Sequence, residues 1–135
     1  MAVIRTAKLE DVPTIAKMYI ECRIDDGYFT EPVLREQYTK HPTSFLIADE
    51  NGKAVGTLYY QADGMAGSVW KLGVLPSYRR RGIATALMNE AESRIKDAGC
   101  LAMVVLSKKE EDAISLYESL NMEKSDTQPM IRLFK

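Results

Sequence analysis

The chain has 135 residues, a formal net charge of −1, and a composition that is 46% hydrophobic and 27% charged. This length and balance predict one globular domain over residues 1–135, with enough apolar material for a core. Proteins that bind nucleic acid usually carry a clear excess of basic residues. The nearly balanced charge therefore argues against a nucleic-acid partner and makes any positive patch a local feature.

Membrane and metal-centred classes also lack support. No apolar run approaches the roughly 20 residues of a membrane span, and the first residues lack the apolar core of a signal peptide. The two cysteines, Cys22 and Cys100, are far apart and have no metal-ligand spacing. We therefore expect no metal site, no disulfide framework and no membrane contact, in a soluble cytoplasmic protein.

Hydrophobic spacing and turn residues predict the elements of the first half of the chain. Thr30 and Pro32 have the character of a helix N-cap and first turn, and Asn51-Gly52 is a strong hairpin signal. In chain order we expect a strand at 2–7, a helix at 10–23, an irregular segment at 23–42 with a helix starting near Thr30, and a hairpin at 44–63.

The second half is predicted to alternate strands and helices. Gly73 lies inside a strand-like run, which often marks a bulge or a close backbone approach. In order we expect a strand at 68–75, a helix from Gly82 to Gly99, a buried strand at 101–107, a short helix at 113–120 and a last strand at 129–134. A strand–helix–strand unit requires a parallel pair, whereas the hairpin is antiparallel, so we predict a mixed α/β sheet.

The stretch from Val74 to Leu87, VLPSYRRRGIATAL, has the features of an anion site. Arg79, Arg80 and Arg81 precede Gly82, where a helix begins and its first amides lack intrahelical acceptors. Such a helix start favours phosphate or pyrophosphate. The glycine patterns of P-loop and Rossmann proteins are absent. A solvated surface or a nucleic-acid contact is the alternative interpretation of the three arginines.

The pattern R-x-x-G-x-A at 79–84 resembles the acetyl-CoA pyrophosphate loop of the GNAT superfamily of N-acetyltransferases, [QR]-x-x-G-x-[GA]. DAISLYESLNM at 112–122 is similar to the second signature of that family. IRTAKLEDVPTI at 4–15 resembles its opening strand and helix, and DENGKAVG at 49–56 its hairpin. The resemblance covers essentially the whole chain in the right order.

The resemblance implies an acyl-CoA N-acyltransferase fold with acetyl-CoA as co-substrate. Its central sheet is mostly antiparallel, with about four flanking helices and a splayed parallel pair of the fourth and fifth strands, here 68–75 and 101–107. The pantetheine arm is then expected to contact the backbone of Leu72, Gly73 and Val74. The pyrophosphate would lie on the amides of Arg79, Arg80, Arg81, Gly82, Ile83, Ala84 and Thr85. Which arginine side chains reach a phosphate stays open.

The resemblance also implies transfer of an acetyl group to a primary amine by direct attack on the thioester. Tyr117 occupies the position of the family's general acid, and the Val74 amide is the expected oxyanion donor. Helix spacing alone would make Tyr117 a core aromatic. No general base stands out. A water chain is one alternative, and the weak side-chain candidates are His41, Asp25, Asp26, Glu31 and Asp63.

Two positions depart from the family pattern. Glu110 stands where the family often has an asparagine that contacts the cofactor, which puts that contact in doubt. Asn121-Met122 replaces the usual Gly-Phe after the last helix, and both replacements suit a helix stop followed by an apolar contact.

The acceptor side is expected to involve residues 23–42 and 62–68. The first of these segments is locally acidic with aromatic residues interleaved, which suggests a cationic acceptor such as a polyamine, aminoglycoside, lysine side chain or peptide N-terminus. They are Asp25, Asp26, Tyr28, Phe29, Glu31 and Tyr38. A non-catalytic acyl-CoA-binding or regulatory protein is the alternative function. Family members are often dimers, so a homodimer is an alternative to a monomer.

Overall fold

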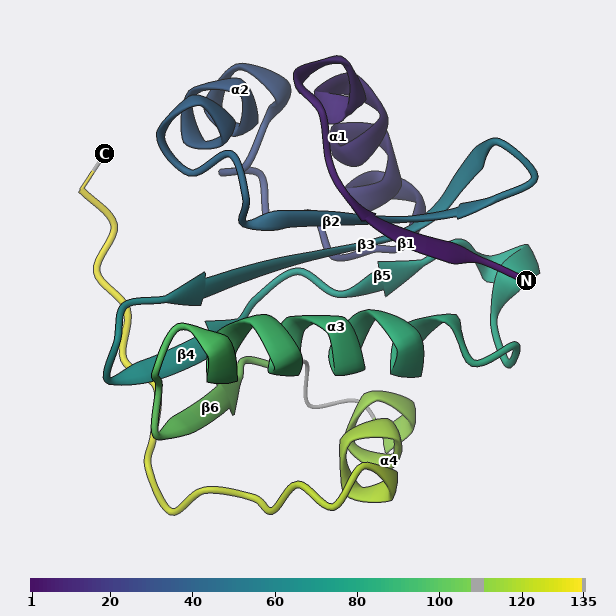
Figure 1. Ribbon diagram of the computed structural model, residues 1–135. Coiled ribbons are helices and arrows are strands. Elements are labelled where there is room, and N and C mark those ends of the chain that lie inside the picture. The colour runs from purple at the N-terminus through teal and green to yellow at the C-terminus, as the bar shows by residue number, and fades with distance from the viewer. Residues whose placement is uncertain (108–110, 135) are drawn as a thin grey trace.

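The computed structural model describes residues 1–107 and 111–134 and shows a six-stranded mixed sheet with helices above and below it (Figure 1). The strands are β1 (Val3–Thr6), β2 (Phe45–Glu50), β3 (Lys53–Ala62), β4 (Ala66–Val69), β5 (Gly73–Val74) and β6 (Ala102–Val105). The helices are α1 (Val12–Glu21), α2 (Glu31–Lys40), α3 (Ile83–Asp97) and α4 (Glu111–Ser119), with short 3-10 turns η1 (Leu9–Asp11) and η2 (Pro76–Tyr78). Among these described helices, none has the length and apolar character to cross a membrane.

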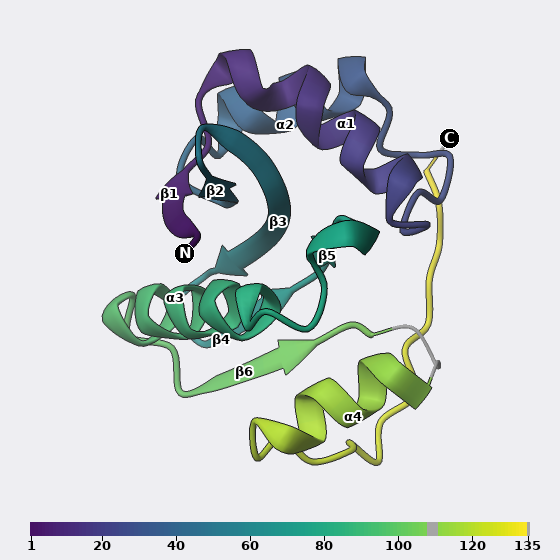
Figure 2. The ribbon, with the colours of Figure 1, turned by 90° about the vertical axis from the view of Figure 1, so that its right-hand side faces the viewer.

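The strand order is β1-β2-β3-β4-β6, with β5 pairing β3 beside β4. Every pair is antiparallel except β4 and β6, which run parallel and are joined through α3. The predicted mixed α/β sheet with one parallel pair is thus confirmed. In Figures 1 and 2, α1 and α2 lie above the sheet, α3 lies below β1, β2, β3 and β5, and β6 lies between α3 and α4.

Two hydrophobic clusters hold the layers together, one on each face of the sheet. Alternate side chains of β2 point to opposite faces, so Leu46 joins the cluster with α3, whereas Ile47 joins the cluster with α1 and α2. The α3 cluster contains Leu87, Ala91 and Ile95, spaced four residues apart on one helix face. The predicted helix periodicities therefore correspond to buried helix faces.

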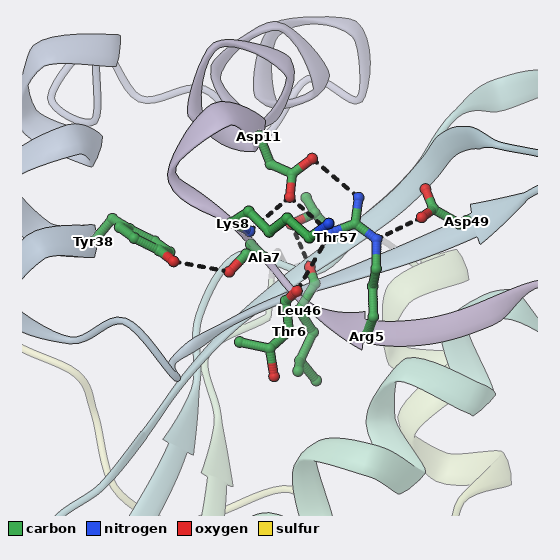
Figure 3. Close-up of polar contacts among 9 residues, drawn as sticks. All are labelled: Arg5, Thr6, Ala7, Lys8, Asp11, Tyr38, Leu46, Asp49 and Thr57. Atoms are coloured by element: carbon green, nitrogen blue, oxygen red, sulfur yellow. Dashed lines mark hydrogen bonds and ion pairs between the residues drawn. The ribbon is translucent and has the colours of Figure 1, made fainter.

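Polar contacts attach the N-terminal strand to the start of α1 (Figure 3). Arg5 donates to both carboxylate oxygens of Asp11, at 2.7 and 3.0 Å, and its Nε donates to Asp49 on β2. The bidentate contact with Arg5 lowers the pKa of Asp11 below its ordinary value. The Tyr38 hydroxyl donates to the Ala7 carbonyl at 3.1 Å and ties α2 to the same corner.

The predicted strand at 129–134 is wrong. Residues 123–134 form neither helix nor strand, and the segment crosses from the level of α4 to the level of α1 and α2 (Figures 1 and 2). A strand needs a neighbouring strand along its length, and a segment that runs across the layers has none. The predicted strand at 68–75 is also divided, into β4 and β5, so the parallel pair is β4–β6.

Gly67 allows α3 to lie close to β4. A Cβ at Gly67 would lie 2.3 Å from Cγ2 of Ile95, a distance that real Cβ atoms essentially never show. We predict that Gly67→Ala lowers the free energy of unfolding by about 1–3 kcal/mol, because the added methyl group overpacks this contact. Urea unfolding measures the change.

The matched control is a double-mutant cycle with Ile95→Ala, which by itself should cost about 2–5 kcal/mol. Removing the Ile95 side chain makes room for the new methyl group, so the double variant should lose less stability than the two single losses together. Strict additivity would contradict the steric explanation.

Candidate functional site

The site lies where the chain leaves the parallel pair. The Leu106 amide donates to the Val69 carbonyl at 3.0 Å and extends the ladder between β6 and β4 by one rung. The Trp70 amide then donates to the Tyr59 carbonyl at 2.9 Å. Within the described residues, β5 pairs only with β3. The two parallel segments therefore separate after Val69, as the predicted splayed pair requires.

A one-residue bulge lies between β4 and β5. Val69 is paired with Tyr60 and Gly73 with Thr57, so residues 70–72 face only residues 58–59 of β3. Gly73 follows this bulge directly. A Cβ on Gly73 would lie 2.9 Å from Ile24 Cδ1, so glycine also allows the chain after α1 to approach. The bulge and the close approach, predicted as alternatives, are both present.

The bulge changes the direction in which the Val74 amide points. The Leu75 amide donates to the Val55 carbonyl at 2.9 Å, which places Leu75 in a hydrogen-bonded pair. Hydrogen-bonded and non-hydrogen-bonded pairs alternate, so the neighbouring pair of Val74 and Gly56 is of the second kind. The N–H and C=O of Val74 therefore point away from β3, toward the side from which β6 has separated.

The loop after β5 ends at an uncapped helix terminus. Arg80 and Gly82 have left-handed backbone, with φ of +63° and +79°, a conformation that turns successive amides toward one concavity. Gly82 is the N-cap of α3 and provides no side-chain cap. The Ala86 amide, which donates to the Gly82 carbonyl at 3.0 Å, is the first helical donor, so the amides of 83–85 have no acceptor within the helix. This terminus can bind an anion.

The three arginines have different contacts. Arg79 Nε donates to the Val74 carbonyl at 3.0 Å. Arg81 Nη1 donates to Glu50 at 3.0 Å, and its guanidinium lies 4.9 Å from the ring centre of Tyr78. Arg80 is exposed and makes no ion pair or side-chain hydrogen bond with another described residue. Of the three, Arg80 thus has the side chain that is available to a ligand.

Tyr117 lies on α4 and is half-buried. It packs against the α3 cluster, which also contains Val74. Burial raises the pKa of Tyr117 to about 12, so the phenol stays neutral over the physiological range. The structure therefore places a protonated hydroxyl and the outward-pointing amide of Val74 around one apolar cluster.

The carboxylates considered as general bases have local partners. Asp26 pairs with Lys71 at 2.8 Å, and Glu31 pairs with Arg35 at 3.2 Å. Asp25 accepts from the Gly27 amide at 3.0 Å, and Asp63 accepts from the amides that follow it. His41 lies exposed at the end of α2. Among the described residues, none of these groups makes a hydrogen bond or ion pair with Val74, and Glu110 lies outside the described residues.

Sequence reasoning missed Lys71, which contacts the segment expected to form the acceptor side. Its Nζ donates to the Ile24 carbonyl at 2.9 Å and lies 5.2 and 5.9 Å from the ring centres of Phe29 and Tyr19. Partial burial raises the pKa of Asp26, but the Lys71 ammonium and backbone amides more than compensate, so the net pKa is lowered. No local pattern in the sequence links Lys71 to a residue 45 positions away.

The described residues contain no group of three or more histidine, cysteine or acidic side chains arranged to hold a metal ion.

Comparison with known proteins decides the family. Residues 12–122 match the acetyltransferase (GNAT) family. The chain belongs to the GNAT family. It is 32% identical over 126 residues to an acetyltransferase of Yersinia pestis, an alignment that covers 92% of this chain and 89% of the relative. The fold predicted from the resemblance is thus confirmed.

Solved GNAT structures agree with this fold. A GNAT-family acetyltransferase of Streptococcus pneumoniae is 28% identical, with a TM-score of 0.76 and coverage of 98% of each chain. An aminoglycoside N-acetyltransferase in complex with CoA is 17% identical, with a TM-score of 0.78 and coverage of 100% of this chain and 96% of that one. At that identity the second comparison supports the fold alone.

Proposed function

We propose that this GNAT protein is a cytoplasmic, acetyl-CoA-dependent N-acetyltransferase that acts on a primary amine. The observation that carries the proposal is the uncapped N-terminus of α3 beside the edge of β5 that points away from β3. The first feature suits a pyrophosphate, and the second offers backbone groups to an extended thioester arm. The two features are joined by one short loop, which matches the layout of acetyl-CoA.

Acetyl-CoA would be held mainly by the backbone. The pyrophosphate would lie on the amides between Arg79 and Thr85, with the pantetheine arm along Leu72, Gly73 and Val74. Arg80 is the arginine proposed to reach a phosphate, because Arg79 and Arg81 already have protein partners. The contact of Arg79 with the Val74 carbonyl would make it a positioning residue for this edge.

The proposed reaction is a direct transfer. The lone pair of the neutral amine attacks the thioester carbon, and the carbonyl π electrons move onto oxygen. The Val74 N–H donates to this oxyanion. Collapse re-forms the C=O bond and breaks the C–S bond, while the amine loses a proton and the departing sulfur gains one. The products are the acetylated amine and CoA thiol.

Tyr117 is proposed to donate a hydrogen bond to the departing sulfur, and the thiolate then takes its proton from water. A phenol with a pKa of about 12 remains a donor at every pH at which the protein would work. The proton from the amine would leave through water, because the carboxylates near the acceptor segment are engaged in turns and ion pairs. This assignment accounts for the lack of a side-chain base.

A cationic acceptor remains part of the proposal, although the structure reduces its electrostatic support. Asp26 and Glu31 are neutralised by Lys71 and Arg35, which leaves Asp25 without an ion pair to another described residue. The aromatic surroundings of Lys71, from Phe29 and Tyr19, would still favour the flat or apolar body of an amine.

The first test concerns the anion site. We predict that Gly82→Val weakens CoA binding at least roughly tenfold, about 1.4 kcal/mol, because valine strains the left-handed backbone at φ +79° and disturbs the amides that hold the pyrophosphate. Arg80→Ala should weaken binding less, and Arg81→Ala least. Isothermal titration of CoA measures all three, with circular dichroism as the folding control. Equal losses for all the variants would assign the binding to side-chain charge instead.

The second test concerns Tyr117. We expect Tyr117→Phe to lower kcat roughly 10²- to 10⁴-fold with little change in CoA affinity. Thiol release with an amine acceptor measures the rate, and Tyr60→Phe, in the same cluster, is the matched control. A protein that only binds acyl-CoA would bind CoA tightly and show no acceptor-dependent release with any of these variants.

The pH profile gives a separate prediction about Tyr117. Its raised pKa, about 12, means that the donor is retained as pH rises from 7 to about 10. The rate should therefore rise as the acceptor amine loses its proton and then level off. A fall of the rate below pH 10 that is absent in Tyr117→Phe would contradict the raised pKa.

The acceptor class is tested with a panel of amines and acetyl-CoA. We predict turnover of polyamines, aminoglycosides or lysine-containing peptides, and little turnover of amines that carry a carboxylate. Asp25→Asn should raise KM for the preferred cation, with little change in kcat, since it removes the unpaired carboxylate. Turnover confined to neutral or acidic amines would reject a cationic acceptor while leaving the acetyltransferase assignment intact.

A further inference from the structure

The Lys71 ammonium is held in a cage of carbonyl, carboxylate and aromatic groups. Its Nζ donates to the Ile24 carbonyl at 2.9 Å and to the Asp26 carboxylate at 2.8 Å. The ring centres of Phe29 and Tyr19 lie 5.2 and 5.9 Å away, within the range of a cation–π contact. Only 14% of the Lys71 side chain is exposed, so the ammonium is largely withdrawn from water. These four partners of Lys71 form what we call the ammonium cage.

Stability alone is a weak reason for such a cage. Withdrawing an ammonium and a carboxylate from water costs free energy, and well-packed apolar side chains in place of a buried ion pair are often equally stable. The surroundings would suit such a replacement. A cavity of about 10 Å³ borders the Lys71 side chain, and its walls include Leu34, Phe45 and Tyr59. The cage is therefore better explained as a binding site for an ammonium group.

The ammonium cage lies beside the edge at which acetyl transfer is proposed. Lys71 is one of the bulge residues 70–72, three positions before Val74. Ile24, whose carbonyl accepts from the ammonium, also lies against the next residue of this edge, since a Cβ on Gly73 would be 2.9 Å from Ile24 Cδ1. An amine acceptor at the Val74 edge would thus have a site for a second ammonium group next to it.

The ammonium cage has no room for a second cation while Lys71 is in it. The adjoining cavity of about 10 Å³ holds at most one water molecule. A tethered group competes at an effective concentration on the order of millimolar, so a free cation enters only by displacing Lys71. The apparent affinity of the cage for a free cation is then reduced by the small fraction of molecules in which Lys71 has left.

We propose that Lys71 is a tethered competitor of the acceptor: its ammonium fills the cage in the free protein, and the non-reacting ammonium of a diamine acceptor replaces it there. The reacting amine of such an acceptor must be neutral, so the cage takes the amine that keeps its proton. Lys71 is then a specificity-determining residue. The part that concerns the acceptor rests on the proposed function, whereas the affinity of the cage for alkylammonium groups does not.

The first experiment empties the ammonium cage and needs no turnover. The probe is n-butylammonium chloride, which is the lysine side chain without its backbone. Isothermal titration at constant ionic strength should show binding to Lys71→Ala at least roughly tenfold tighter than to the wild type, because the competitor is gone. Lys53→Ala, the matched control, should behave like the wild type, since Lys53 also lies over a ring, 5.4 Å from the centre of Tyr78, but outside the cage.

Two further controls define the chemistry of the ammonium cage. The neutral analogue n-butanol should show no gain with Lys71→Ala, and adding Asp26→Asn to Lys71→Ala should abolish the gain for n-butylammonium. Circular dichroism checks folding. Lys71→Gln keeps part of the stem and a donor for the Ile24 carbonyl, so it replaces Lys71→Ala in every comparison if the alanine variant does not fold, with a smaller expected gain.

The second experiment compares two acceptors of equal length, the diamine putrescine and the monoamine n-butylamine, with acetyl-CoA. Lys71→Ala should lower KM for putrescine roughly fivefold or more relative to KM for n-butylamine, because only the diamine can use the vacated cage. Lys71→Arg keeps a charged competitor and should leave that ratio as in the wild type.

The two experiments fail separately. The cage is not an alkylammonium site if n-butylammonium binds no more tightly to Lys71→Ala, or if the gain persists with n-butanol or with Asp26→Asn. An unchanged ratio of the two KM values overturns the diamine acceptor and makes Lys71 a structural tether. If the wild type turns over no amine at all, the proposed function fails, and the titration with n-butylammonium still decides whether Lys71 fills an alkylammonium site.

Discussion

One extra residue between β4 and β5 determines the chemistry that this site can perform. The Trp70 amide donates to the Tyr59 carbonyl on β3. Every second residue of an antiparallel strand hydrogen-bonds to the same neighbour, so without the bulge Val74 would also bond to β3, at Val55. The bulge shifts the pairing by one residue, so that Leu75 hydrogen-bonds to Val55 and the N–H and C=O of Val74 point away from β3. Arg79 then donates to the outward carbonyl at 3.0 Å, so the amide is the group that the proposed function offers to a substrate. The arginine loop therefore serves both the anion site and the edge beside it.

Local signals in the sequence were enough to predict this framework. Asn51-Gly52 marks the hairpin and Gly82 marks the start of α3, because these residues have the left-handed backbone that few residues adopt. Gly73 marks the bulge, where a Cβ would lie 2.9 Å from Ile24 Cδ1. The roles of the three arginines could not be predicted in this way. Arg81 pairs with Glu50, 31 positions away, and that contact exists only after the hairpin and the loop have packed together. Side-chain availability is a tertiary property, whereas backbone geometry at a glycine is largely local.

The same distinction explains two other departures from expectation. Asp25, Asp26 and Glu31 form an acidic cluster in the sequence, but Lys71 and Arg35 neutralise two of the three in the folded chain. Residues 129–134 have the composition of a strand, but strand formation depends on an available edge as well as on propensity. In both cases the sequence shows correctly what the residues can do. The partners are determined by elements far away in the chain.

The burial of Tyr117 limits the part that this residue can take in acyl transfer. The pKa of Tyr117, about 12, lies roughly 3.5 units above the ordinary thiol pKa near 8.5. Transfer of its proton to a thiolate would therefore cost about 5 kcal/mol of free energy. Complete proton transfer before the C–S bond breaks is therefore unfavourable. A hydrogen bond that strengthens as charge develops on sulfur carries no such penalty. In the proposed reaction, Tyr117 and the Val74 amide would then have the same physical role at the two atoms that gain negative charge, since each is a neutral donor held in place by the α3 cluster.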